Sequence, residues 1–165
     1  MLDNRILVNK GTLSLDTIFG YGSIPVHKVL SHPNGYFYVT GWTQPRGSNP
    51  IEIGIYVNKV DSAGNLVDSV ALTNFNGYDI QTYYKEGCVL NSGDLLLPFR
   101  WDTTVASCLK VMIVNENLQL KKTITRYFKR SINVVSSVAT NDGGAAILGE
   151  VQDTVDGVLI HIIST

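Results

Sequence analysis

Two tryptophans are the residues in this sequence best suited to bind a ligand. Trp42 and Trp101 each stand at the end of an apolar run, where a strand would pass into a loop. An indole ring at such a rim can stack on a sugar ring, and Tyr38 and Arg100 lie close enough in sequence to contribute. We favour a structural role, as cover for a gap between sheets or an oligomer contact, because the last third of the chain has no tryptophan. Glycan binding is kept as the alternative.

Residue types that support catalysis or metal binding occur without the spacing that either needs. The three histidines are His27, His32 and His161, and no His-Glu-x-x-His or Cys-x-x-Cys sequence is present. No serine lies in a Gly-x-Ser-x-Gly turn. The carboxylates of Asp153 and Asp156 suit a solvated loop better than an acid–base pair. We therefore expect no enzyme activity, no metal and no cofactor.

Basic residues gather in one stretch. Five of the 13 Lys and Arg residues lie between positions 121 and 130, and they are Lys121, Lys122, Arg126, Lys129 and Arg130. Such a cluster can bind a polyanion. The formal net charge of −1 does not favour nucleic acid as the partner. We predict a docking patch for an acidic surface of another protein or of a sister subunit.

Charged residues are scarce in this chain. They make up 16% of 165 residues, against roughly 25% in an average soluble domain, while apolar residues make up 44%. With so little charge repulsion, we expect a homodimer, a higher homo-oligomer or an assembly with other structural proteins. The length suits a single domain over residues 1–165.

The N-terminal segment is too polar, and its apolar run too short, for a signal peptide. No apolar run is long enough to cross a membrane, so we expect no membrane insertion. Cys88 and Cys108 fall on the first and third strands of one predicted sheet. A strand would separate them, so we expect two free thiols rather than a disulfide.

Residues 54–72 form the clearest structural unit. Branched residues such as Val57 and Val60 precede a polar turn at 61–65, and an apolar run resumes at Leu66. This pattern predicts a β-hairpin. Helices are not expected, because no long segment keeps apolar residues at three-and-four spacing.

The hairpin belongs to an internal repeat of short strands. Three Asn/Asp/Gly turns, each followed by an apolar strand, begin near residues 33, 91 and 141. A strand precedes each turn, at 26–30, 87–90 and 132–139, and a third strand follows at 54–60, 108–114 and 157–163. The first two copies add a fourth strand at 66–72 and 118–125. Four antiparallel strands in about fifty residues is the period of a propeller blade.

Two segments carry a family resemblance: residues 11–20, Gly-Thr-Leu-Ser-Leu-Asp-Thr-Ile-Phe-Gly, and residues 33–41, Pro-Asn-Gly-Tyr-Phe-Tyr-Val-Thr-Gly. They resemble the bacterial and phage β-propeller repeat, whose blades end in a turn plus Leu-Asp-Thr-Ser-Phe and continue into Pro-Asp-Gly and an apolar strand ending in glycine. Later copies depart from it, since 118–125 keeps no Leu-Asp-x-x-Phe and Pro98-Phe99 replaces a small residue and glycine. The resemblance implies an all-β propeller but no particular function, because propellers include lectins, enzymes and scaffolds.

We predict three four-stranded blades that form half of a ring. Residues 1–22 supply a strand that completes a blade, residues 23–72 and 79–125 form two blades, and 131–165 form a third that lacks its last strand. Three blades are too few for a ring of typically four to eight, so we predict a six-bladed ring of two chains. Residues 13–19 of one chain would pair beside 157–163 of the other. The predicted interface residues are Leu13, Leu15, Ile18, Phe19, Leu159, His161 and Ile163.

The function we expect is that of a non-catalytic structural or interaction protein. The low charge, the abundance of Asn, Thr, Ser and Gly, and the repeat type favour a bacteriophage virion subunit of the tail, collar or capsid. Its location would be the virion, or the cytoplasm if the source is not viral. A carbohydrate-binding propeller lectin is the alternative. A glycosidase-like enzyme comes third, because it needs carboxylates that only the fold could bring together.

Overall fold

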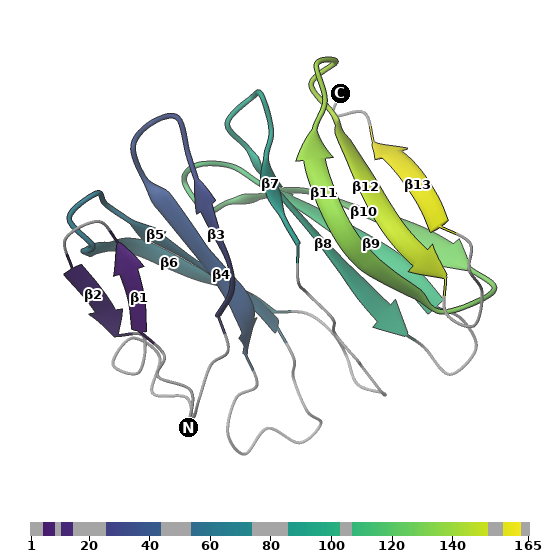
Figure 1. Ribbon diagram of the computed structural model, residues 1–165, viewed down its shortest axis with the longest axis horizontal. Helices are drawn as coiled ribbons and strands as arrows, with labels where there is room; N and C mark the ends of the chain where they lie inside the picture. Colours follow the sequence, from purple (N-terminus) through teal and green to yellow (C-terminus); the bar gives the residue numbers. More distant parts are fainter. Residues whose placement is uncertain are drawn as a thin grey trace. The chain divides into compact units, whose positions relative to one another are not determined.

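The described part of the protein consists of β-strands and the turns between some of them. The computed structural model describes residues 5–8, 11–14, 26–43, 54–73, 86–102, 107–151 and 157–162, and no helix occurs among them (Figure 1). The chain divides into two compact units, residues 1–77 and 78–165. The division falls between the predicted first and second blades.

The first unit contains two antiparallel sheets. One is a hairpin of β1 (Arg5–Val8) and β2 (Gly11–Ser14). The other, here called the first sheet, has the order β3-β4-β5-β6. Its strands are β3 (Val26–Ser31), β4 (Phe37–Thr43), β5 (Gly54–Val60) and β6 (Leu66–Thr73).

The second unit contains the second and third sheets. The second sheet runs in the order β10-β9-β8-β7 and the third in the order β11-β12-β13. The second sheet is built from β7 (Cys88–Val89), β8 (Leu95–Asp102), β9 (Ser107–Val114) and β10 (Leu120–Phe128). The third is built from β11 (Ile132–Ala139), β12 (Ala145–Val151) and β13 (Gly157–Ile162).

Five hairpins close with the same turn, at residues 32–36, 61–65, 90–94, 115–119 and 140–144. In each, the N–H of the first residue donates to the carbonyl of the fifth, and the N–H of the fourth donates to the carbonyl of the first. The fourth residue has a positive φ and is glycine at positions 35, 64, 93 and 143, whereas Leu118 occupies it with a φ of 59°. A type I turn followed by one left-handed residue has this geometry, which explains the recurring glycine.

The side chain that stabilises each turn depends on which strands the turn joins. Between third and fourth strands, Asp61 or Asn115 is the first residue, and its Oδ1 accepts from the N–H groups two and four residues later. Between first and second strands, Asn34, Ser92 or Asp142 is the third residue, and its side-chain oxygen accepts from the N–H two residues on. The repeat therefore includes the side-chain hydrogen bonds of equivalent turns as well as the order of the strands.

Central strands of the first two sheets are buried on both faces. Tyr38 and Val39 are neighbours on β4, so they point to opposite faces, and neither has exposed surface. On β8, the successive residues Leu95, Leu96 and Leu97 alternate between the two faces, and none has exposed surface. Continuous apolar runs of this kind are typical of strands that are covered on each side.

The second and third sheets pack face to face, with β11 against β7, β8 and β9. Their common core consists of Leu90, Leu96, Leu109, Val111, Ile113, Val134, Ala145 and Ile147. Two polar contacts join the sheets: Arg100 Nη1 donates to Asn133 Oδ1 at 2.8 Å, and Asn91 Nδ2 donates to the Thr140 carbonyl at 2.9 Å. The third sheet thus has one face that is covered within the unit.

The strands lie close to where the sequence predicts them. The all-β class with three antiparallel sheets of three or four strands is confirmed, and β5 has the predicted ends. At the N-terminus, the sequence predicts a strand at 13–19. The structure has the strand β2 at 11–14, which pairs with β1 in a hairpin. Residues 15–19 lie outside the described part. A local partner of this kind costs little loop-closure entropy.

The predicted strand positions of the two cysteines are confirmed. Cys88 lies on β7 and Cys108 on β9, with β8 between them, and the structure has no disulfide between them. The register pairs Cys88 with Leu96 and Cys108 with Trp101, which places the two cysteines on opposite faces of the sheet.

Candidate interaction surface

The outer face of the third sheet, opposite its packed face, has exposed apolar residues, with Glu150 and His161 exposed beside them. Ser136, Leu148 and Leu159 are direct cross-strand partners, and Val138 shares this face two residues along β11. Val138, Leu148 and Leu159 are 60%, 43% and 72% exposed. We call these three residues the apolar stripe. It crosses β11, β12 and β13, so it is one continuous patch rather than scattered surface residues.

The apolar stripe contrasts with the equivalent positions of the other sheets. On β9, the third strand of the second sheet, seven of eight residues are buried and one is half-buried. β13 is the third strand of its own sheet, yet Leu159 and His161 are exposed. The third sheet therefore has the composition of a sheet covered on both faces but is covered on one.

The outer edge of β13 is equally open. In the first and second sheets the third strand has a fourth strand beside it, β6 and β10, whereas no described strand lies beyond β13. Gly157–Ile162 reads Gly-Val-Leu-Ile-His-Ile and contains no Lys, Arg, Asp or Glu. An uncharged edge strand exposes a row of unpaired N–H and C=O groups to any strand that can approach.

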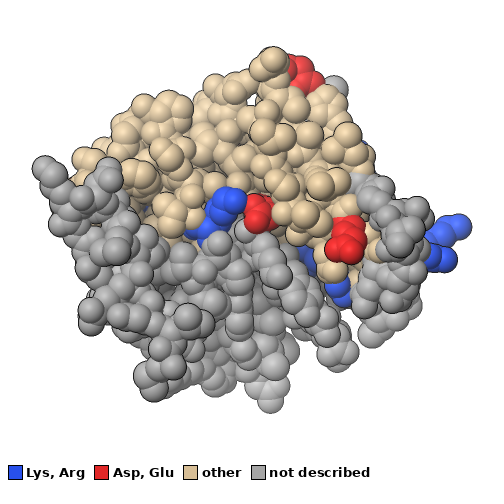
Figure 2. Space-filling view, viewed as in Figure 1, with Lys and Arg blue, Asp and Glu red and all other residues tan. Residues whose placement is uncertain are grey.

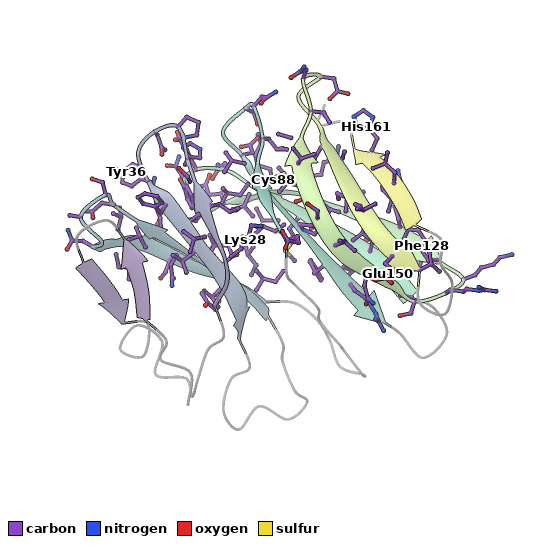
Figure 3. The ribbon with its side chains drawn as sticks, viewed as in Figure 1. Lys28, Tyr36, Cys88, Phe128, Glu150 and His161 are labelled. Carbon is purple, nitrogen blue, oxygen red and sulfur yellow. The ribbon has the colours of Figure 1, made fainter. Side chains whose placement is uncertain are left out.

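A polar cluster ties β13 to the turn between β11 and β12. His161 Nε2 lies 3.0 Å from Asp142 Oδ2 and 3.4 Å from Thr140 Oγ1, and Thr140 also donates to Asp142 Oδ1 (His161 is labelled in Figure 3). The Thr140 hydroxyl, the Gly144 N–H and the charge of His161 hold the pKa of Asp142 below its usual range.

This cluster is not arranged as a catalytic triad. A triad requires the carboxylate on one imidazole nitrogen and the hydroxyl on the other. Here the same nitrogen of His161 faces both groups, so no proton can pass from Thr140 through the ring to Asp142. The cluster therefore fixes the end of β13 against the turn, and a hydrolytic role has no support from its geometry.

The predicted basic docking patch lies along β10 and the two residues after it. Lys121, Lys122, Arg126, Lys129 and Arg130 are all exposed. Lys121 Nζ forms an ion pair with Asp94 Oδ2 at 2.7 Å. β10 is the outer strand of the second sheet, so most of these charges stand on a sheet edge. On the face that Figure 2 shows, the charged side chains of the described residues form small separate groups, with both signs of charge present.

The structure describes only some side chains of the predicted aromatic rim. Trp42 and Trp101 are both the next-to-last residues of second strands, β4 and β8, as the sequence indicates, but their side chains lie outside the described part. Tyr38 has no exposed surface, and its ring packs edge-on against His32 at 5.4 Å between centroids. Arg100 is also buried, where it bonds to Asn133. Tyr38 and Arg100 therefore belong to the core in this conformation.

The predicted interface residues are described incompletely. Leu13 lies on β2, and Leu159 and His161 lie on the outer face of the third sheet. Leu15, Ile18, Phe19 and Ile163 fall outside the described residues, as do Asp153 and Asp156. The sequence reasoning missed Val138 and Leu148. The run Ala-Ala-Ile-Leu at 145–148 could have shown Leu148, because a strand with apolar residues on both faces needs cover on both faces.

Within the described residues, no group of three or more His, Cys, Asp or Glu side chains could hold a metal ion. The same residues include no helix that is long and apolar enough to span a membrane. The chain matches no protein-family model, no curated protein and no solved structure.

Proposed function

We propose that this chain is a non-catalytic structural and interaction protein that assembles through its third sheet. The observation that carries the proposal is the apolar stripe, Val138, Leu148 and Leu159, exposed on three neighbouring strands, with Leu148 directly beside Leu159 and diagonal to Val138. Contiguous apolar patches of this kind mark protein interfaces more often than free surface. The net charge of −1 leaves little repulsion between copies.

The assembly we propose is a six-bladed ring of two chains, in which each of the three larger sheets is a propeller blade. The repeated strand order and the repeated turn chemistry support this reading of the sheets. The packing of the third sheet on the second supplies a model for the missing contact. A sheet from the second copy would cover the apolar stripe as the second sheet covers the inner face.

The place we propose for the assembly is a virion. The resemblance of residues 11–20 and 33–41 to phage and bacterial propeller repeats supports this, as does the low charge of the chain. Mass spectrometry of purified particles from the encoding phage would test it. Presence of the chain in stoichiometric amounts is expected, and its absence from intact particles would refute a virion role.

The solution mass by size exclusion with light scattering tests the assembly. We expect twice 18.1 kDa for the native chain and 18.1 kDa for the double variant Val138→Lys/Leu148→Lys. Val67→Lys is the matched control, since Val67 is also 51% exposed on a strand but lies outside the apolar stripe. A native chain that stays monomeric at high concentration would contradict the proposal.

A carbohydrate-binding lectin is the second candidate. It is favoured by the equivalent places of Trp42 and Trp101, each next to last on a second strand. A glycan array is the test, and binding that Trp42→Ala abolishes would establish it. No binding at millimolar sugar would reject the lectin and leave assembly as the one proposed function.

A further inference from the structure

β13 has the sequence of a central strand in the position of an edge strand. Four of its six residues, Val158, Leu159, Ile160 and Ile162, are branched and apolar, and the strand contains no Lys, Arg, Asp or Glu. Its counterparts β5 and β9 are third strands too, and each is enclosed between two neighbours. The sequence of β13 therefore suits a strand that is paired along both edges.

The fourth strands of the first and second sheets carry charge that β13 lacks. β10 bears three exposed cations, Lys121, Lys122 and Arg126, and β6 bears Asp68 beside Ser69 on exposed positions. Charged residues on an edge strand prevent further pairing, because a completed sheet would desolvate them. The basic residues on β10 are explained in this way without any ligand. The chain thus protects its fourth strands and leaves the edge of β13 unprotected.

A candidate partner strand exists in the same sequence. β1 and β2 pair only with each other among the described strands, as a two-stranded sheet. An isolated hairpin is marginally stable in water and needs further strands or packing. β2 has one edge against β1 and another with no described partner. The chain therefore contains a hairpin, β1 and β2, that lacks a larger sheet, and a third sheet that lacks a fourth strand.

We infer that β13 accepts β2 of a second copy as the fourth strand of the third sheet, so that two chains exchange their N-terminal hairpins. This inference rests on the proposed self-assembly and specifies how it occurs. A second copy is favoured over a foreign chain, because each copy offers both the accepting edge and the donated strand. Two such contacts, related by a twofold axis, give each β13 and each β2 a second neighbouring strand.

Proline substitution along β13 tests the accepting edge in the full-length chain. Successive N–H groups of a strand point to opposite sides, so one of Leu159→Pro and Ile160→Pro removes a bond to β12 and the other removes an outward N–H. The variant that removes the bond to β12 is the internal control and should lower the melting temperature. The outward variant should keep the fold, seen by circular dichroism and melting, and lose the dimer.

The outcomes separate this inference from the proposed function. A folded, monomeric outward variant supports strand exchange when Leu159→Ala, which shortens a side chain of the apolar stripe but keeps the backbone N–H, remains a dimer. An outward variant that remains a dimer overturns strand exchange, and if Val138→Lys/Leu148→Lys is nevertheless monomeric, assembly through the apolar stripe still stands. A native chain that is monomeric overturns both.

Disulfide cross-linking identifies the donor strand. Chains carrying Leu13→Cys are mixed with chains carrying Leu159→Cys or His161→Cys, all with Cys88→Ser to remove the half-buried native thiol. Oxidation should join one Leu13→Cys chain to one β13 variant chain, which mass spectrometry of the linked peptides detects. Links only between two β13 variants would show that β13 pairs with itself. In a chain that carries both Leu13→Cys and Leu159→Cys, a link within that one chain would show internal closure. Either result overturns the exchange.

Discussion

At the scale of single residues, Asn58 is the clearest departure from the rules of a packed core. It lies on β5 with no exposed surface, and neither its Oδ1 nor its Nδ2 has a hydrogen-bond partner in the described structure. A buried polar group without a partner costs about 1–3 kcal/mol. The register places it between Val39 on β4 and Ser69 on β6, and Tyr56 and Val60, two residues away on β5, are buried.

We expect Asn58→Leu to raise the free energy of unfolding by about 1–3 kcal/mol, because it removes the unpaired amide while nearly keeping its volume. Chemical denaturation measures the change. Asn58→Ala is the control, since it removes the amide but leaves a cavity, and it should gain less. A loss of stability in Asn58→Leu would mean that a bound water pairs the amide in solution.

Asp61 predicts an acid-dependent part of the stability. The side-chain and backbone bonds from Asn65, followed by backbone bonds from Ala63 and Gly64, lower the pKa of Asp61. A lowered pKa in the folded state adds stability above the ordinary value of about 3.9, and this stability is lost as the pH falls through the folded pKa. We expect Asp61→Asn to lower the melting temperature at neutral pH. Below about pH 4, the melting temperature of Asp61→Asn should decrease less with falling pH than that of the native chain.

Ser62→Ala, in the same turn, is the control for Asp61→Asn and should leave the pH profile of the melting temperature unchanged. An Asp61→Asn profile parallel to that of the native chain would show that the carboxylate bonds are not made in solution.

At the scale of elements, the five hairpin turns show how position selects residue type. Four turns have glycine at the left-handed position, but the turn between β9 and β10 has Leu118, which is only 5% exposed. Two effects oppose each other there. Left-handed backbone costs a non-glycine residue about 1–2 kcal/mol, whereas removing a buried leucine side chain costs about 2–5 kcal/mol.

Burial should therefore win, and we expect Leu118→Gly to lower the free energy of unfolding by roughly 1–3 kcal/mol. Gly64→Ala is the matched comparison at the equivalent position, with a φ of 91° and no atom within 4 Å of the added Cβ. It should cost only the backbone term of about 1–2 kcal/mol. A stabilised Leu118→Gly would show that the leucine is not packed in solution.

At the scale of the whole molecule, the association of copies should depend little on salt. The apolar stripe and β13 bear no Lys, Arg, Asp or Glu, so no ion pair between charged residues has to form across the proposed contact. At about 1 M salt the Debye length falls to about 3 Å, which would screen a contact made by the basic residues of β10. We expect the dimer dissociation constant, measured by sedimentation, to stay constant or fall. A strong rise of the dissociation constant with salt would indicate that the basic residues of β10 form the interface.

The sequence by itself determined the strands and their turns. Alternation, β-branched runs and the glycine of each left-handed turn are local signals, and residues such as Gly35 and Gly143 act through their own φ. It also placed Cys88 and Cys108 on separated strands, because strand order follows from short connections.

Only the tertiary structure decided which apolar residues are covered. Ile147 and Leu148 are neighbours of the same type on β12, yet Ile147 packs on the second sheet and Leu148 is exposed. It likewise placed Tyr38 and Arg100 in the core, although both stand near rim tryptophans in the sequence. Burial depends on contacts between residues far apart in the chain, and period-two alternation gives two faces without saying which one meets a neighbour.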